Sequence, residues 1–476
     1  MSSQPPPNFL AQRLFASRRE FLKAGLVGAA ALVTGHGQSR HDGPIRLHPD
    51  NPHYFLWRGK PAVLITSGEH YGAVMNLDFD YVRYLKELAA HRFNLTRIFS
   101  GAYRETAKSF NIAGNTLAPA SGRFICPWAR NGDKFDLTKW DNTYFERLKD
   151  VIAKAGDRGV VVELVLFCPM YADDMWEVSP MNARNNINGI GNITRQEIYS
   201  GKHADLLDAQ RAMVRKLVGE LNGFDNLYYE VCNEPYERGG LTPEWNNQII
   251  ATIVETEAGL PKKHLIAQNF PPSSHAVSDL NPNVSILNFH AAKPESVSLN
   301  YHLDRPIAFD ETGGLDRSDR KYRTEGWEWI MAGGGVYDHL DFSFTTDGPD
   351  GSAVPLPSGT PGGGGPELRR QLQVLKEFIE GFDFVRMAPS DAVVAGTETT
   401  AHVLSEKGLA YAVYLKGGSR GGLLLELPVG RYKAEWVNTK SGKVEARETF
   451  DHSIGGKILR SPDYAEDIAL ALRRVR

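Results

Sequence analysis

Short apolar segments alternate with amphipathic segments along most of the chain, and this alternation limits the possible folds more than any other feature. Apolar runs bounded by turn residues predict strands, and apolar positions three and four residues apart predict helices such as 81–91, 145–158 and 205–221. Strands alternating with helices form a parallel sheet covered by helices. Eight strands are predicted, a number that closes into a (β/α)8 barrel: residues 61–66, 94–99, 160–167, 227–231, 264–268, 284–289, 306–309 and 340–344.

Two of these strands end in a glutamate that is followed by a residue incompatible with regular structure. Segment 229–235 places Asn233 and Glu234 after the fourth strand, and segment 305–313 places Glu311 after the seventh. The catalytic groups of such barrels lie at the C-terminal ends of the strands, and two facing carboxylates can cleave a glycosidic bond. These are two of 57 acidic residues, and Asn-Glu-Pro also occurs as a plain turn. Their positions at strand ends nevertheless favour a catalytic pair.

Asn-Glu-Pro after the fourth strand, with a glutamate ending the seventh, resembles clan A of the glycoside hydrolases. The resemblance implies that Glu234 is the acid/base and Glu311 the nucleophile of a retaining enzyme. It also implies that Asn233 bonds the substrate 2-hydroxyl and that Arg97 supports the nucleophile electrostatically. His290 matches a common active-site histidine. Within the clan, the chain is similar to cellulase-like family 5 members and apiosidase-like proteins.

One departure from the clan A pattern concerns the orientation of the nucleophile. Many members carry a tyrosine two residues after the strand-six histidine, and that position is Ala292 here. Arg97 near Glu311 is expected to favour the charged form of the nucleophile, whereas Glu234, beside that negative charge, should keep its proton longer. A retaining enzyme needs this division of protons, with the two carboxyl groups about 5 to 5.5 Å apart.

Polar and aromatic residues at the ends of other predicted strands are candidates for binding sugar. Sugars stack on aromatic faces and are held by a few polar groups. Packing within the barrel is an equally good explanation for each candidate, although a charged residue at the barrel mouth is costly unless it binds something. The candidates are Glu69, His70 and Tyr71 after the first strand, Tyr171 and Trp176 after the third, and Phe344 in the eighth.

The region after residue 384 has a different pattern. Residues 348–366, rich in Gly, Pro and Ser, are predicted to form a long loop on the catalytic rim, because a helical pattern resumes at Glu367. We therefore assign 40–384 to the barrel. Residues 385–476 predict a small antiparallel β-sandwich, from strands at 410–415, 423–427, 432–437 and 444–449. Its segment 436–442 resembles a turn in the β-domain of apiosidase-like proteins, and we expect the sandwich to brace the barrel without binding glycan.

The N-terminal region, residues 1–39, resembles a twin-arginine export signal. Arg18 and Arg19 precede Phe-Leu-Lys and an apolar run at 24–33 that is too short to span a membrane. An amphipathic helix is the alternative. The resemblance predicts cleavage before residue 40 and a periplasmic or secreted protein, with no membrane association after cleavage.

Composition excludes several classes of function. The formal net charge is −3 without a long basic run, so no nucleic-acid partner is expected. Cys126, Cys168 and Cys232 are expected to be structural, and no Cys/His spacing indicates zinc. We expect an oligo- or polysaccharide substrate, no metal and no cofactor.

Other functions on the same barrel remain as alternatives. An exported carbohydrate-binding pseudoenzyme would have the same fold, but both glutamates are retained. A metal-dependent hydrolase would need His-x-His after the first strand, where residues 68–71 contain a single histidine. No Gly-x-Ser-x-Gly elbow of a serine hydrolase is present. The sequence leaves open the sugar, the linkage, the mode of attack along the chain and the oligomeric state.

Overall fold

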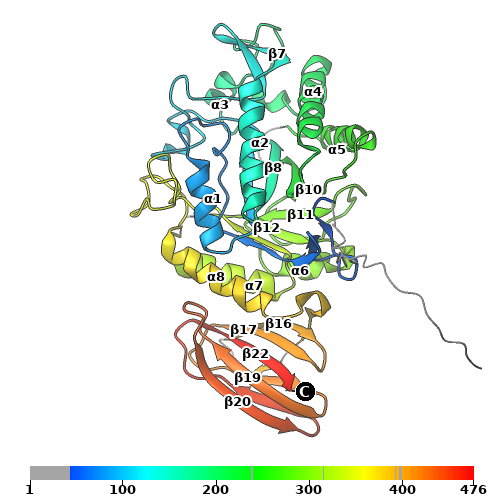
Figure 1. The fold of residues 1–476 in the computed structure, drawn as a ribbon, viewed down its shortest axis with the longest axis vertical. Helices are drawn as coiled ribbons and strands as arrows, with labels where there is room; N and C mark the ends of the chain where they lie inside the picture. The colour runs from blue at the N-terminus through cyan, green and yellow to red at the C-terminus, as the bar shows by residue number, and fades with distance from the viewer. Residues whose placement is uncertain (1–42, 237–239, 315, 392, 396–398, 476) are drawn as a thin grey trace, which may run out of the picture. The chain divides into compact units, whose positions relative to one another are not determined.

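The computed structural model describes residues 43–236, 240–314, 316–391, 393–395 and 399–475 (Figure 1). The predicted export signal at 1–39 lies outside the described residues. Residues 41–476 form one compact unit. Within the described ranges, no helix combines the length and the hydropathy needed to cross a bilayer.

Eight parallel strands form the central sheet, as the sequence predicted, in the order β4-β13-β12-β11-β10-β9-β8-β5. Gln268 and Glu311 are partly exposed, and every other position in these strands is buried. Burial on both faces is expected of strands that fill a barrel on one side and contact helices on the other. The strands are β4 (Leu64–Thr66), β5 (Leu95–Phe99), β8 (Val161–Phe167), β9 (Leu227–Cys232), β10 (Ile266–Phe270), β11 (Ile286–His290), β12 (Ile307–Thr312) and β13 (Val336–His339).

The barrel closes between the segment after β4 and strand β5. Glu69 and Arg97 form a parallel bridge, in which the Arg97 amide donates to Gly68 O at 3.1 Å and the His70 amide donates to Arg97 O at 2.9 Å. A Cβ atom on Gly68 would lie 2.7 Å from the Leu95 carbonyl oxygen, so a larger residue would force the two segments apart. The closure therefore lies at the end of the barrel that carries the candidate catalytic residues.

Helices surround the barrel, and several begin where a side chain caps the first turn. Asp80 and Asp141 each accept hydrogen bonds from two backbone amides at the start of α1 and α2. Figure 1 shows these two helices side by side along the barrel. The α-helices are α1 (Tyr81–Ala90), α2 (Asn142–Asp157), α3 (Asp173–Val178), α4 (Ala204–Leu221), α5 (Pro243–Ala258), α6 (Glu295–Asn300), α7 (Asp319–Met331) and α8 (Pro366–Glu380), and the 3-10 helices are Ser109–Asn111, Arg195–Glu197, Tyr301–Leu303 and Phe384–Arg386.

The prediction for the eighth strand is wrong. The strand is Val336–His339, and residues 340–344 follow it as a loop. Two buried polar residues, Asp338 and His339, interrupt the apolar pattern of the true strand, whereas the apolar side chains of 340–344 contribute to the cavity wall described below. The first strand is also shorter than predicted, because residues 60–62 pair with β2 in a hairpin instead.

Small antiparallel elements cover the ends of the barrel. Strands β2 and β3 form a hairpin, with Arg58 and Gly59 both at positive φ in its two-residue turn. The strands outside the barrel and before residue 384 are β1 (Arg46–Leu47), β2 (Phe55–Trp57), β3 (Lys60–Ala62), β6 (Trp128–Asn131) and β7 (Lys134–Trp140).

The C-terminal region forms two antiparallel sheets, in the orders β14-β16-β17-β22-β19-β20 and β15-β18-β21. Apolar side chains from both sheets share one hydrophobic core, which agrees with the predicted sandwich. The strands are β14 (Ala388–Pro389), β15 (Val393–Ala395), β16 (Thr400–Glu406), β17 (Ala410–Lys416), β18 (Gly422–Glu426), β19 (Gly430–Val437), β20 (Val444–His452), β21 (Gly456–Arg460) and β22 (Asp467–Val475).

Strand β17 contributes to two hydrophobic cores through its two faces. Tyr411, Val413 and Leu415 belong to the core of the sandwich, whereas Ala412 and Tyr414 belong to the core of the barrel. Successive side chains of a strand point to opposite faces, so this strand is covered on both sides. The sheets therefore share apolar packing with the barrel.

A buried ion pair joins the barrel helix α7 to strand β22. Arg323, which is 1% exposed, donates to Asp467 Oδ1 at 2.6 Å and to Gln371 at 2.8 Å. The Tyr414 hydroxyl donates to Asp467 at 3.0 Å, and its ring stacks on Trp327. These contacts fit the expected bracing role of the C-terminal sheets.

Replacing Arg323 with alanine should destabilise the protein by about 3–5 kcal/mol, because Asp467 would remain buried without its cation. Arg320 provides a matched control on the same helix, since its side chain is 63% exposed and lies 3.8 Å from Glu466. Arg320→Ala should leave stability almost unchanged. Urea unfolding followed by tryptophan fluorescence measures both variants. Similar urea midpoints for the two variants would show that the buried ion pair does not stabilise the contact between the barrel and the sheets.

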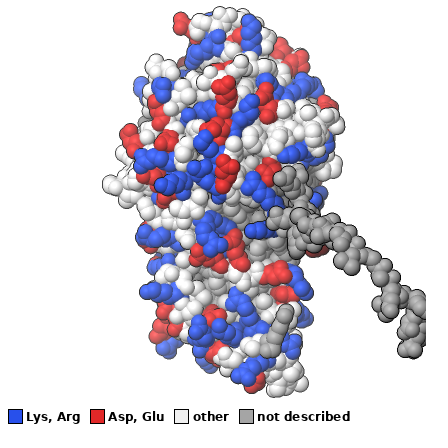
Figure 2. Space-filling model, viewed as in Figure 1, with Lys and Arg blue, Asp and Glu red and all other residues white. Residues whose placement is uncertain are grey.

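Surface charge is mixed on the face seen in Figure 2. Lys and Arg side chains are interspersed with Asp and Glu side chains over both the barrel and the C-terminal sheets. This face therefore presents no extended field of one sign to a charged partner.

Candidate active site

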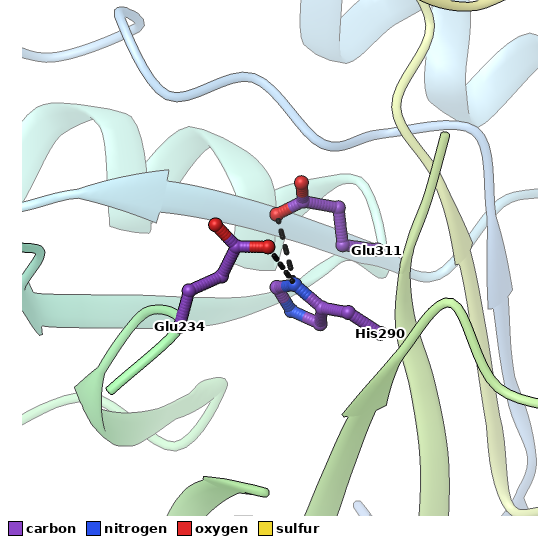
Figure 3. Close-up of side chains that lie close together, drawn as sticks. All are labelled: Glu234, His290 and Glu311. Atoms are coloured by element: carbon purple, nitrogen blue, oxygen red, sulfur yellow. Dashed lines mark hydrogen bonds and ion pairs between the residues drawn. The ribbon is translucent and has the colours of Figure 1, made fainter. Parts of the chain in front are cut away.

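Two glutamates and a histidine from three strands meet at the C-terminal end of the barrel (Figure 3). Glu234 lies two residues after β9, Glu311 lies in β12 and His290 ends β11. His290 Nδ1 is 3.2 Å from Glu234 Oε1 and 3.6 Å from Glu311 Oε2. One carboxylate oxygen of Glu234 lies within 4.8 Å of one of Glu311. The two predicted catalytic carboxylates therefore face each other across a single histidine.

Local backbone irregularities orient the side chains of both glutamates. Glu234 has φ 38°, a value that few residues other than glycine adopt and that is typically found at functional sites. Strand β12 changes register with β13 between Phe309 and Thr312. Neighbouring strand residues usually point to opposite faces, yet Asp310 and Glu311 both contact Arg97. The register shift thus directs two consecutive acidic side chains toward one cation.

Arg97 is fully buried and contacts Glu311. Its guanidinium forms a bidentate pair with Glu230, at 2.8 and 2.9 Å, and Nη1 lies 3.1 Å from Glu311 Oε2. Nη2 donates to Asn233 Oδ1 at 2.7 Å. The geometry places Arg97 where the sequence predicted it, beside Glu311.

A separate chain of hydrogen bonds reaches Glu234. Asn233 Nδ2 donates to the Tyr171 hydroxyl at 2.9 Å, and that hydroxyl donates to Glu234 Oε2 at 2.6 Å. Arg97 fixes the other end of the Asn233 amide, so the amide has one orientation. Tyr171 therefore contacts the expected acid/base.

Tyr71 contacts Glu311 although it was predicted only as a residue near the barrel mouth. Its hydroxyl hydrogen-bonds both Glu311 Oε2 and Glu69 Oε1, and its ring stacks on Phe99 with centroids 4.0 Å apart. Arg97 Nη1 donates to the same hydroxyl at 2.7 Å. A tyrosine from the segment after β4 thus contacts the Glu311 carboxylate directly.

Burial and charge set the protonation of the three central groups. Burial raises the pKa of Glu311, against the opposing charges of His290 and Arg97. Burial also acts to raise the pKa of Glu234, but hydrogen bonds from His290 and Tyr171 lower it overall. Burial acts to lower the pKa of His290, but the charges of Glu311 and Asp310 raise it well above its ordinary value.

These directions differ from the expectation that Glu234 keeps its proton longer than Glu311. Burial is the largest cause at Glu311 and raises its pKa, although the charge of His290 opposes it. At Glu234 the hydrogen bonds from His290, whose Nδ1 lies nearer to Glu234 than to Glu311, and from Tyr171 outweigh the effect of burial on the pKa. The raised pKa of His290 favours its protonated form within hydrogen-bonding distance of Glu234.

A cavity of about 250 Å³ opens beside the two glutamates. Its wall includes the predicted residues Glu69, His70, Asn233, Tyr171 and Phe344. Further wall residues come from segments 99–117 and 340–361, in which only Phe344 was predicted to bind sugar. They include Tyr103, Glu105, Phe110, Asn115, Phe342 and Thr360.

Trp176 does not belong to this wall. It is 5% exposed, lies in α3 and donates from Nε1 to the Ile193 carbonyl at 2.9 Å. His70 lines the cavity, but burial lowers its pKa to about 3, and its ring stacks on Phe79. For Trp176, the packing alternative therefore describes the structure better than sugar binding does.

Glu234, His290 and Glu311 have the composition and the spacing of a cation site. One property of the residues favours an acid–base arrangement over a metal, because Arg97 already supplies a positive charge at Glu311. A second acidic group, formed by Glu163, Glu230 and Asp310, is fully buried around the same arginine.

The chain was compared with known proteins. No family model matches it, and no curated protein gives a significant match. Solved structures with a similar fold include a protein from Bacteroides vulgatus ATCC 8482 with a provisional assignment as a glycoside hydrolase, at 14% identity and TM-score 0.63, covering 92% of this chain and 83% of that one.

Two further structures are similar over almost their whole length. One, described as a glycoside hydrolase, is 13% identical with TM-score 0.62 and covers 91% of this chain and 97% of its own. The other is a glycoside hydrolase family 5 protein from Bacteroides vulgatus ATCC 8482, 14% identical with TM-score 0.61, covering 91% and 94%. At these identities the likeness establishes the fold.

Proposed function

We propose that the protein is a retaining glycoside hydrolase that cleaves O-glycosidic bonds, with Glu311 as nucleophile and Glu234 as acid/base. The observation that carries the proposal is the pair of strand-end carboxylates, whose nearest oxygens lie within 4.8 Å in one cavity. In inverting glycosidases the carboxyl groups are about 6.5–9.5 Å apart, to leave room for a water molecule. Nearest oxygens within 4.8 Å are compatible with the carboxyl separation of about 5–5.5 Å in retaining enzymes, and so favour double displacement.

The contacts of each glutamate support this assignment of roles, whereas the pKa directions in the free protein, raised for Glu311 and lowered for Glu234, run against it. Glu311 contacts Arg97 and Tyr71, which stabilise an ionised nucleophile and fix the position of one oxygen. Glu234 contacts His290 and Tyr171 instead. The similarity in fold to glycoside hydrolases, including a family 5 protein, adds support because their folds cover almost the whole chain.

In the first step, an oxygen of Glu311 attacks the anomeric carbon and the bond to the leaving oxygen breaks. The leaving oxygen takes a proton from Glu234. Because the pKa of Glu234 is lowered in the free protein, that proton must first reach it. His290 Nδ1, at 3.2 Å from Glu234 Oε1, is the donor within reach.

In the second step, water attacks the glycosyl ester of Glu311 and gives its proton to Glu234. The ester bond breaks, and Glu311 becomes a carboxylate again beside Arg97. A lowered pKa suits Glu234 in this step, because the group acts as a base. Two displacements on the same carbon restore the original anomeric configuration.

Screening the purified protein against aryl glycosides, oligosaccharides and polysaccharides tests the proposal. We expect turnover of at least one substrate class, and its loss in both Glu311→Ala and Glu234→Ala for unactivated substrates. The alternative, a carbohydrate-binding pseudoenzyme, would bind a saccharide in calorimetry without releasing product. Binding without turnover across the panel would therefore reject the proposal.

We also propose that the protein acts after export, since the segment with Arg18 and Arg19 resembles a twin-arginine signal. Replacing both arginines with lysine should leave the protein in the cytoplasm in cell fractionation. Unchanged export of this variant would reject the twin-arginine route.

A further inference from the structure

The Tyr71 hydroxyl lies between two carboxyl groups and one cation. It is within hydrogen-bonding distance of Glu69 Oε1 and Glu311 Oε2, and Arg97 Nη1 approaches the same oxygen at 2.7 Å. A phenol has a single proton to donate. If both carboxyls were ionised, the proton could satisfy only one of them, and Glu311 would share its donor with Glu69.

The charge around Glu69 does not balance if every acid is ionised. Its side chain has no solvent exposure, and among the described residues its Oε2 has no hydrogen-bond partner. Arg97 is the one cation in contact with it in the described part of the chain, and it is already engaged in a bidentate pair with Glu230. The titratable groups that face Glu69 are Arg97 from β5, Glu311 and Asp310 from β12, Asp338 from β13, Tyr84 from α1 and Tyr71.

We propose, on the basis of the function proposed above, that Glu69 is a positioning residue that keeps a proton and directs the Tyr71 hydroxyl to the nucleophile. The Glu69 carboxyl donates to the Tyr71 oxygen, and Tyr71 donates its own proton to Glu311 Oε2. Arg97 donates a hydrogen bond to Glu69 Oε1. This oxygen can accept that hydrogen bond even while the proton of the carboxyl group is bound to it. Glu69 therefore does not bind sugar, in contrast to the expectation from the sequence.

Buried environment and charge agree with this protonation state. Burial raises the pKa of Glu69 well above its ordinary value, and the charge of Glu311 raises it further, against the opposing charge of Arg97. A carboxyl with a raised pKa is neutral below that pKa and ionises as the pH rises through it. Ionised Glu69 would compete for the Tyr71 proton and repel Glu311, so activity should fall on the alkaline side.

The first test measures kcat/KM against pH in Glu69→Gln. An amide cannot ionise, so we expect activity within about tenfold of the parent at neutral pH and loss of the alkaline limb attributed to Glu69. Glu163→Gln is the matched control: Glu163 is equally buried, its pKa is also raised, and it accepts from a tyrosine hydroxyl, that of Tyr228, at 2.7 Å. The control should keep the alkaline limb.

The second test is a double-mutant cycle with Tyr71→Phe. Glu69→Ala and Tyr71→Phe should each lower kcat by about 10- to 100-fold with little change in KM, and the double variant should be no worse than Tyr71→Phe alone. Additive losses in the double variant would overturn the proposal. It would also be overturned if the alkaline limb of the pH profile stayed unchanged in Glu69→Gln, or if Glu163→Gln removed that limb as well.

A third readout does not depend on turnover, which separates failure of this inference from failure of the proposed function. Infrared difference spectra of the intact protein at neutral pH, parent minus Glu69→Gln, should contain the carbonyl band of a protonated carboxyl group. Absence of that band would overturn the inference even in an active enzyme. A protein that turns over no glycoside but shows the band would reject the proposed function alone.

Discussion

Replacing Glu311 with alanine is expected to lower kcat by about 10⁴-fold or more, the scale on which loss of a catalytic nucleophile acts. The physical reason is that no other carboxylate can take over its role. Among the described residues, Glu69 is the one other acid that contacts both Arg97 and Tyr71, and its side chain is fully buried. Steady-state kinetics on the best substrate from the screen measure the loss.

Azide distinguishes a missing nucleophile from a misfolded protein. In Glu311→Ala the cavity left by the side chain admits azide, which should attack directly and give a glycosyl azide of inverted configuration. Partial recovery of turnover with that product supports the assignment. If turnover in Glu311→Ala stayed close to that of the parent, Glu311 would not be the nucleophile.

Replacing Glu234 with alanine should affect substrates according to their leaving groups. For unactivated glycosides, kcat/KM should fall by about 10²–10⁴-fold, the typical contribution of general acid catalysis. For dinitrophenyl glycosides, whose leaving group needs little protonation, kcat/KM should change far less. The second step still lacks its base, so kcat for these substrates should fall, and a burst of phenol should precede slow turnover.

The stereochemistry of the azide product separates the two roles. In Glu234→Ala azide intercepts the glycosyl ester on Glu311, so the glycosyl azide should have retained configuration, opposite to that from Glu311→Ala. A comparable fall in kcat/KM for activated and unactivated substrates would contradict the role of Glu234 as the acid/base.

The barrel was predictable because its strands are buried on both faces and therefore appear as continuous apolar runs. The strand pattern failed at the eighth strand, where two consecutive buried polar residues interrupt the apolar run. Asp338 and His339 place polar groups inside β13, which concealed the eighth strand, and the apolar run at 340–344 belongs to the cavity wall. The positions of Glu234 and Glu311 followed from the strand ends, since those depend only on local sequence.

The detailed chemistry of the site depends on distances that no local pattern contains. Tyr71, from the segment after β4, reaches Glu311 in β12 past the intervening strand β13, 240 positions away in the sequence. The pKa directions of Glu234 and Glu311 depend on the burial of each carboxyl and on His290, which lies 3.2 Å from Glu234 and 3.6 Å from Glu311. Trp176 had the residue type of a sugar platform, but α3 directs its ring nitrogen to the Ile193 carbonyl.

The most direct test of the central claim is proton NMR of the first product released from the substrate with the highest turnover, recorded before mutarotation. Double displacement through Glu311, supported by carboxylate oxygens within 4.8 Å of each other, predicts that the first-formed sugar has the anomeric configuration of the substrate. First formation of the opposite anomer would contradict the claim, because it would require a single displacement by water.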